Sequence, residues 1–342
     1  MKKFASVFLM IAILMSTLNM SAYAIVPGED SYMGQEDGYI QIDYETQTQQ
    51  FIPQSDIPKF NGESSYDALN PTERACMDTI NAQIAAYHNS EATLFNDVNN
   101  GEFSFVTSNL IDYMQFSGIV LVAVFDGGRY IKHGTGFMLD SQNIMTALHV
   151  VVEQDATTNI VYPLHFYDEI RVYFGITESL GVLDYDTFFN VEHTDYVEVS
   201  LVTYSTGSIS YPNMNKYDWC IGTLETPVSN AYYFDCVGTD EFTIQDDSYI
   251  VGYPSQYTYE MVITYGNLTN SYPPSSASHY PQIVDILEAS NIGEAGMSGG
   301  PVYTISDSLK CHGVFILAYE DCSFAVMFYD DLLDVIAEII SS

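Results

Sequence analysis

The sequence predicts an all-β core that begins at about residue 113 and is followed by a helix near the C-terminus. Short apolar segments rich in Val, Ile, Tyr and Phe recur with turn residues between them, and Asp126-Gly127-Gly128 has the composition of a tight hairpin turn. Apolar residues between 331 and 340 instead recur at helical spacing. Many short strands favour a barrel or sandwich over a parallel sheet. The expected strands are 118–125, 130–139, 144–147, 170–174, 197–204, 219–224, 248–251, 260–265, 283–287, 301–304, 313–317 and 324–328.

Residues 1–24 have the features of a secretory signal peptide. Lys2 and Lys3 supply the positive start, an apolar stretch covers 4–18, and Ala22-Tyr23-Ala24 places small residues where a signal peptidase reads. The apolar stretch is short for a membrane span. We therefore expect cleavage after Ala24 and a secreted, extracellular protein; a retained N-terminal anchor is the alternative.

Residues 25–112 differ in composition and expected secondary structure from the rest of the chain. The stretch 41–54 is polar and rich in Gln, and no series of strands is expected in this region. Asn70-Pro71-Thr72-Glu73 has the composition of a helix start, with Asn as the cap and Glu three residues later. A helix is expected from there to about residue 87. The region is interpreted as a partly helical propeptide or as an N-terminal extension kept in the mature protein.

Composition narrows the classes of partner. The chain holds 45 acidic residues against nine Lys and Arg, for a formal net charge of −36. Such a surface repels phosphate backbones and anionic lipids, so nucleic acids and membranes are excluded in favour of a protein or peptide substrate. Extracellular solubility is the simplest reason for the charge, and attraction of basic substrates is a second. No motif implies a metal ion or another cofactor, and the oligomeric state is left open.

Five cysteines are too few for a disulfide scaffold and match no zinc spacing. Pairing of some of them is expected in an exported protein. Cys311 and Cys322 flank an expected hairpin, which makes them one candidate pair, although sequence alone does not determine the connectivity.

The clearest chemical signal is the segment 293–301, GEAGMSGGP. A serine hydroxyl is a poor nucleophile unless a base takes its proton and the surroundings stabilise the oxyanion. Gly296 permits a turn that would direct the N–H groups of Gly296 and Ser298 inward as an oxyanion hole. Ser298 is therefore the candidate nucleophile.

His149 and Asp218 are the matching candidates for the base and for the group that orients it. His149 follows the apolar segment 144–148 and is expected at the end of a strand, where a rigid general base could be held. Asp218 directly precedes an apolar strand and could accept a hydrogen bond from the second imidazole nitrogen. Rival carboxylates, none followed by an equally apolar strand, are Asp184, Asp186 and Asp195.

These segments resemble the trypsin-like serine proteases of the chymotrypsin fold. The shared segments are Thr146-Ala147-x-His149, Tyr217-Asp218-Trp219, Gly252-Tyr253-Pro254 and Gly296-x-Ser298-Gly299-Gly300-Pro301. The order His, Asp, Ser is also that of the chymotrypsin arrangement. Within the family, the chain is most similar to the secreted glutamyl endopeptidases of Gram-positive bacteria. The resemblance implies two six-stranded antiparallel β-barrels, one over 113–228 carrying His149 and Asp218, the other over 229–342 carrying Ser298.

Two departures from that pattern bear on activation and specificity. Proteases of this fold that are activated by N-terminal cleavage carry an Asp before the nucleophile, where this chain has Met297, so activation by that ion pair is excluded. The positions that bind a Glu side chain in the glutamyl endopeptidases correspond to Phe315 and Gly293. An apolar wall does not compensate a carboxylate for its lost hydration. We therefore expect an apolar side chain, rather than Glu, beside Gly293, Phe315 and Ala318, with the substrate backbone paired to 316–318, which includes Ile316.

Two alternatives remain beside a secreted endopeptidase. HtrA-type quality-control proteases share the His149-Val150-Val151 pattern. They usually carry a C-terminal peptide-binding domain, and only 44 residues follow Ser298 here, which makes this the less favoured alternative. A non-catalytic extracellular binding protein on a protease scaffold is the alternative of another class. An α/β-hydrolase esterase would need its Ser before its Asp and His, the reverse of the order here.

Overall fold

A computed structural model describes the β-rich part of the chain together with most of its N-terminal region. The signal peptide expected at 1–24 and the rival carboxylates Asp184, Asp186 and Asp195 lie outside the described residues. The described residues are 38–88, 103–106, 114–153, 165–176, 196–205, 216–229, 231–238, 243–257, 260–272, 286–305, 308–318 and 322–342.

The first barrel is a closed antiparallel sheet of six strands in the order β8-β7-β4-β5-β6-β9, closed by pairing of β8 with β9. The two-residue turn between β4 and β5 has positive φ at both Gly127 and Gly128, as such hairpins require. The strands are β4 (Ile119–Asp126), β5 (Arg129–Met138), β6 (Asn143–Thr146), β7 (Glu169–Phe174), β8 (Tyr196–Ser205) and β9 (Cys220–Leu224).

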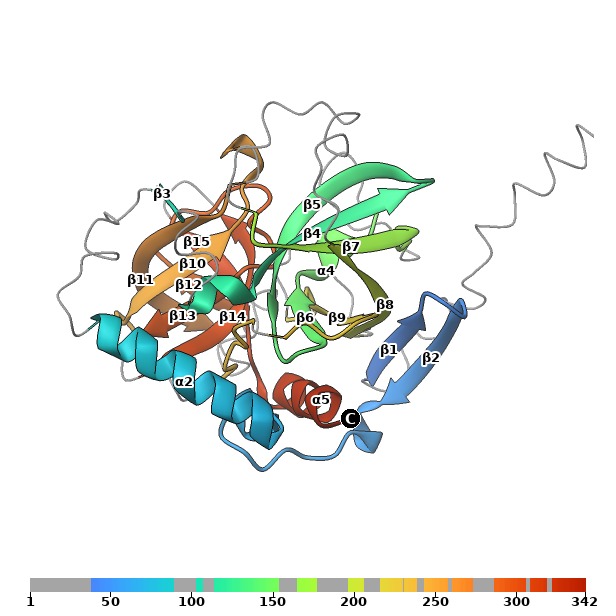
Figure 1. Ribbon diagram of the computed structural model, residues 1–342, viewed down its shortest axis with the longest axis horizontal. Helices are drawn as coiled ribbons and strands as arrows, with labels where there is room; N and C mark the ends of the chain where they lie inside the picture. Colours follow the sequence, from blue (N-terminus) through green and yellow to red (C-terminus); the bar gives the residue numbers. More distant parts are fainter. Residues whose placement is uncertain are drawn as a thin grey trace, which may run out of the picture.

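The second barrel repeats this construction in the order β10-β13-β14-β15-β12-β11, closed by pairing of β10 with β11. A short strand, β3 (Phe103–Phe105), adds to the outside of β11. The expectation of two six-stranded barrels is confirmed, and Figure 1 shows them side by side. The strands are β10 (Asp247–Gly252), β11 (Val262–Tyr272), β12 (Ile286–Ala289), β13 (Pro301–Ile305), β14 (Leu309–Ala318) and β15 (Ser323–Met327).

A hairpin of β1 (Gly38–Asp43) and β2 (Thr48–Pro53) extends the first barrel. The expectation that residues 25–112 hold no strand series is wrong here. β7 covers only the first residues of one edge of β8, and β1 pairs with the remainder, from Leu201 to Ser205. The Gln-rich hairpin thus pairs with an edge of β8 that would otherwise be open. The weakly apolar sequence of the hairpin does not indicate this pairing.

Helices connect the N-terminal region to both barrels. The helix α2 (Pro71–His88) begins as predicted: Asn70 Oδ1 accepts the N–H groups of Thr72 and Glu73, and Glu73 Oε2 accepts the N–H of Asn70. Figure 1 shows α2 and the C-terminal α5 (Asp330–Ser341) on the same side of the barrel pair. The other helices among the described residues are α4 (Leu148–Val151) and the 3₁₀ turns η2 (Gln54–Asp56), η3 (Ser65–Ala68), η4 (Met114–Gly118) and η5 (Ser255–Tyr257).

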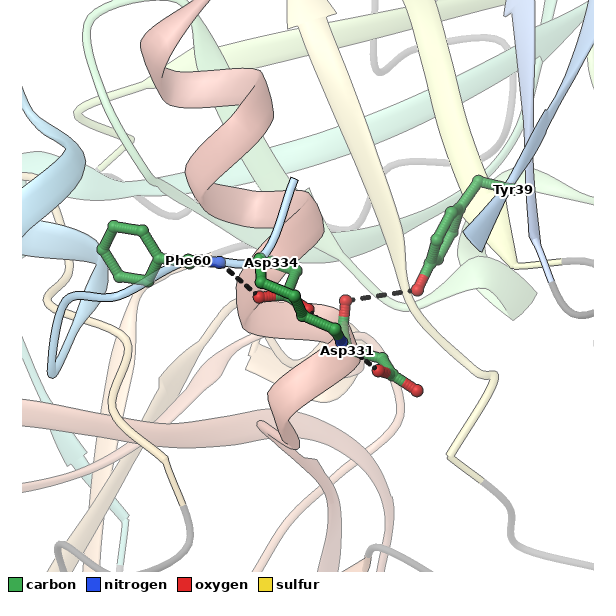
Figure 2. Close-up of polar contacts among 5 residues, drawn as sticks. Tyr39, Phe60, Asp331 and Asp334 are labelled. Carbon is green, nitrogen blue, oxygen red and sulfur yellow. Dashed lines mark hydrogen bonds and ion pairs between the residues drawn. The ribbon is translucent and has the colours of Figure 1, made fainter. Parts of the chain in front are cut away.

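The start of α5 binds the segment that precedes α2 (Figure 2). Lys59 Nζ lies 3.0 Å from Asp331 Oδ1 and 2.6 Å from Asp334 Oδ2, and the Phe60 N–H donates to Asp334 Oδ1 over 2.7 Å. The Tyr39 hydroxyl donates to the Asp331 carbonyl over 3.2 Å. These contacts bring together parts of the chain almost 300 residues apart and raise the pKa of Lys59. No helix in the described ranges is both long and apolar enough to cross a membrane.

Cysteine placement contradicts the candidate pair Cys311–Cys322. Cys322 adjoins the turn end of the β14–β15 hairpin, where Ser323 pairs with Ala318, whereas Cys311 lies toward the opposite end. At about 3.3 Å per residue, the separation along the hairpin far exceeds the ~7 Å that a disulfide tolerates between Cα atoms. The backbone of Cys311 instead pairs with that of Cys236 in an isolated parallel β-bridge.

Candidate active site

His149 lies in α4, a single helical turn that follows β6. Strand β6 ends at Thr146, so the expectation that His149 ends a strand is wrong by three residues. The neighbouring Leu148, Val150 and Val151 are buried and anchor the turn, while the imidazole stays partly exposed. A histidine on a short, well-anchored turn is held in place and still accessible.

Lys132 satisfies the end of this turn from β5. Its Nζ donates to the carbonyls of His149 and Val152, over 2.7 and 3.0 Å. Carbonyls at a helix end have no partner within the helix, so a side-chain donor there fixes the turn. Burial lowers the pKa of Lys132 to about 8, while the negative Asp218 acts in the opposite direction.

Asp218 holds His149 by two hydrogen bonds across 69 residues of sequence. Its Oδ1 accepts the His149 backbone N–H over 2.9 Å, and its Oδ2 accepts Nδ1–H over 2.8 Å. Asp218 is buried just before β9, beside the fully buried Trp219. Because the carboxylate can only accept, Nδ1 carries the proton in the neutral ring and Nε2 is left as the acceptor.

Ser298 lies in a sharply turned segment of the second barrel that packs on β5 and β6 of the first. The carbonyl of Ser298 accepts the Thr135 N–H over 2.7 Å, and the side chain is partly exposed. Gly299 has φ +92°, and a Cβ there would lie 2.2 Å from Thr146 Oγ1 and 2.9 Å from the amide nitrogen of Ala147. The backbone at Ser298 and Gly299 therefore packs against the segment that leads to His149.

The hydrogen bonds within this turn leave the N–H groups of Gly296 and Ser298 available. Met297 donates to Glu294, Gly299 to Phe315 and Gly300 to Met297. Among the described residues, the N–H groups of Gly296 and Ser298 meet no acceptor. Gly296 has φ +96°, the left-handed conformation that glycine allows without strain.

Met297 anchors the turn to the core of the second barrel through its side chain. Its side chain is fully buried in an apolar cluster with Ile250, Val302 and Phe315. A thioether in such surroundings forms no ion pair, so the turn is held by apolar packing and by backbone hydrogen bonds instead.

Gly293, Phe315 and Ala318 meet at one side of the turn. A Cβ at Gly293 would lie 2.3 Å from Phe315 Cζ and 3.1 Å from Ala318 Cβ, so the buried Phe315 ring fills the space between them. Strand β13 pairs with β14 only as far as Val314, which leaves one edge of Ile316–Ala318 without a strand partner among the described residues.

The sequence profile of the trypsin-like peptidase domain matches residues 134–309, which include the β5 glycines, His149, Asp218 and Ser298. The chain belongs to this family. No curated protein sequence matches the chain.

Two solved structures are similar to the trypsin-like peptidase. The structure of a Glu endopeptidase in complex with MPD aligns with TM-score 0.51 and 15% identity, over 72% of this chain and 99% of its own. A scabies mite inactivated protease paralogue, S-I1, aligns with TM-score 0.46 and 16% identity, over 71% and 99%. At this identity the first likeness establishes the chymotrypsin fold and not the substrate.

Two residues at the site of this trypsin-like peptidase, Lys132 and Thr135, were not predicted from the sequence to contribute to it. Lys132 carries no local signal, because it reaches α4 only after β5 and β6 have paired. Thr135 lies between Gly134 and Gly136 in the strand expected at 130–139. Its position between two glycines was the available signal, since glycines permit other backbone segments to approach closely.

Proposed function

We propose that this trypsin-like peptidase is a secreted serine endopeptidase that hydrolyses peptide bonds with Ser298 as nucleophile, His149 as general base and Asp218 as the group that orients His149. The observation that carries the proposal is the pair of hydrogen bonds from His149 to Asp218. One fixes the backbone of the histidine and the other fixes its ring, so Nε2 is the free acceptor.

The reaction follows from these positions. Ser298 Oγ attacks the scissile carbonyl as its proton passes to His149 Nε2, and the C–O bond forms as the carbonyl π electrons move to oxygen. The imidazolium then gives that proton to the leaving amine, so that the C–N bond breaks and an acyl-enzyme remains. Water repeats the sequence and releases the acid. Asp218 stays ionised and stabilises the imidazolium through Nδ1–H.

The oxyanion is stabilised by the N–H groups of Gly296 and Ser298. Their lack of an internal acceptor supports this role, because backbone donors beside a partly exposed serine are available to a substrate oxygen. Donors fixed before the reaction need no reorganisation as charge develops, and a single such donor is worth about 2.7–4 kcal/mol.

The side chain before the scissile bond is proposed to be apolar. The Phe315 ring and the methyl group of Ala318 line the place where a Glu-specific pocket would supply polar donors, and Gly293 offers no side chain. A carboxylate would lose its hydration there without compensation. The open edge of Ile316–Ala318 supports pairing with the substrate backbone.

Secretion and the catalytic state are parts of the same proposal. The signal-like residues 1–24 support export, and the charge of −36 favours protein substrates over nucleic acids. A non-catalytic binding protein on this scaffold is disfavoured, because binding alone would require neither the hydrogen-bonded His149–Asp218 pair nor the glycine-rich turn at Ser298.

The test is hydrolysis of casein by the purified protein, together with labelling by a serine-directed fluorophosphonate. We expect activity and one labelled serine in the natural protein, and both lost in Ser298→Ala, with residual turnover at least about 10³-fold lower. A matched variant, Ser290→Ala, removes a hydroxyl from a described loop of the same barrel and is expected to retain activity. Full activity or undiminished labelling in Ser298→Ala contradicts the proposal.

A further inference from the structure

Thr135, buried in β5, connects the segments that carry His149, Ser298 and the oxyanion turn. Its N–H donates to the Ser298 carbonyl over 2.7 Å, and its own carbonyl accepts the Thr146 hydroxyl over 2.7 Å, three residues before His149. Its hydroxyl donates to the Gly296 carbonyl over 2.8 Å and accepts the Tyr253 N–H over 3.0 Å. The donor assignment is unambiguous, since a carbonyl only accepts and an amide N–H only donates.

Both peptide groups that flank Gly296 are held in this way. The Ala295 carbonyl accepts the Ser255 N–H over 2.8 Å. In a trans peptide, C=O and N–H point in opposite directions, so this bond directs the Gly296 N–H away from Ser255. The Thr135 hydroxyl fixes the next peptide group through the Gly296 carbonyl. Rotation of either group would break a hydrogen bond in a buried or crowded place.

The surroundings of Gly296 leave no room for a side chain. A Cβ there would lie 2.5 Å from the Tyr253 carbonyl oxygen, 2.7 Å from His133 Nε2 and 2.9 Å from the Ser255 nitrogen. The Tyr253 carbonyl accepts His133 Nε2–H over 2.9 Å, and His133 Nδ1 accepts the Tyr130 hydroxyl over 2.7 Å. The network therefore runs from β5 through the Gly252-Tyr253-Pro254 turn to the oxyanion turn.

We propose that Thr135 is a positioning residue that keeps the Gly296 N–H directed at the substrate oxygen, in place of the ion pair that Met297 cannot form. The inference rests on the proposed serine peptidase reaction and extends it. Its consequence is that the oxyanion hole is assembled by hydrogen bonds between the two barrels and needs no newly cleaved N-terminus to complete it.

The test compares Thr135→Val, which keeps the shape and removes the hydroxyl, with Thr135→Ser, which keeps the hydroxyl. Acylation by p-nitrophenyl acetate gives a burst whose amplitude counts reactive serines and whose rate reports the oxyanion step. We expect Thr135→Val to keep a burst of about one per chain at a rate about 10- to 100-fold lower, because one lost oxyanion donor costs ~10²–10³-fold. Thr135→Ser is expected to stay within about threefold of the natural rate.

A matched control separates positioning from loss of stability. Thr304→Val removes another buried threonine hydroxyl, one that is hydrogen-bonded to His312 and lies toward the end of β13 away from Ser298. We expect it to lower the melting temperature as Thr135→Val does and to leave the burst rate unchanged. An unchanged burst rate in Thr135→Val, or an equal fall in Thr135→Ser, overturns the proposal.

Amide hydrogen exchange tests the hydrogen bonds of Thr135 independently of catalytic activity. Thr135→Val is expected to speed exchange of the Tyr253 and Met297 amides at least about tenfold, since the peptide groups around Gly296 lose an anchor. If the natural protein gives no burst, the proposed function fails, and exchange alone decides on Thr135. Unchanged exchange at both amides then overturns the positioning role.

Discussion

At the scale of single residues, the proposed apolar specificity depends on Phe315. Its ring is buried and reaches into the space that a side chain at Gly293 would occupy. The resemblance supplied the position of this residue, and the structure adds that the ring occupies the space beside Gly293 instead of leaving it open. A filled pocket accommodates short apolar side chains better than long ones, because packing density leaves no room for extra methylene groups.

Phe315→Ala is expected to move the cleavage preference from short to long apolar side chains. Mass-spectrometric profiling of cleavage sites in a peptide library measures this shift. The substitution removes a buried aromatic ring and is expected to lower the free energy of unfolding by about 3–5 kcal/mol. Phe328→Ala, at another fully buried phenylalanine, is the control and should lower stability with no change in preference. A preference for Glu in the natural protein, or an identical profile in Phe315→Ala, would refute this account of the pocket.

At the scale of elements, the segment 38–88 is built into the barrels. Its hairpin extends β8, and Met77 of α2 is buried against Tyr233, whose N–H lies 3.1 Å from the Met77 Sδ. The Ser65 N–H donates to the Cys236 carbonyl over 2.9 Å. These contacts lie on β8 and on 231–238, and Lys59 and Phe60 add contacts to α5; none of them involves His149 or Ser298. We therefore propose that 38–88 is a retained extension and not an inhibitory propeptide.

The active protein is accordingly expected to keep residues 38–88, which intact-mass measurement and N-terminal sequencing of the secreted form will test. Asp334→Ala removes the acceptor for Lys59 and for the Phe60 N–H (Figure 2) and is expected to cost roughly 1–3 kcal/mol of stability with catalysis intact. Asp330→Ala, on the same helix, is the control. An active form whose N-terminus lies beyond residue 88 would show that the segment is dispensable.

At the scale of the whole molecule, two buried histidines make stability depend on pH. Burial lowers the pKa of His133 to about 4 and that of His312 to about 3, from 6.5 in an exposed histidine. Below pH 6.5 the unfolded chain therefore binds protons that the folded chain does not, and stability falls as the pH falls. Burial raises the pKa values of Asp140 and Asp235, and these carboxyls act in the opposite direction at lower pH.

Comparison of the natural protein with His312→Gln isolates one of these contributions. The glutamine amide can still hydrogen-bond Thr304 but does not titrate, so the variant should lose less stability between pH 6.5 and 4.5. The difference in slope is expected to reach about 1.4 kcal/mol per pH unit, the value for one proton. Urea unfolding at a series of pH values measures it, and parallel slopes would show that His312 is not the group responsible.

Local sequence patterns were enough to predict the twelve barrel strands, the capping box of α2, the C-terminal helix and the candidates His149, Asp218 and Ser298. These features depend on local chemistry: apolar runs, turn glycines, a cap residue and glycines around a serine. Three features became visible only in the folded chain: the β1–β2 hairpin pairs with β8, the backbone of Cys311 pairs with that of Cys236, and Thr135 binds Gly296 across 161 residues. Each of these depends on which edges and faces meet once the barrels close, and a local pattern does not encode that meeting.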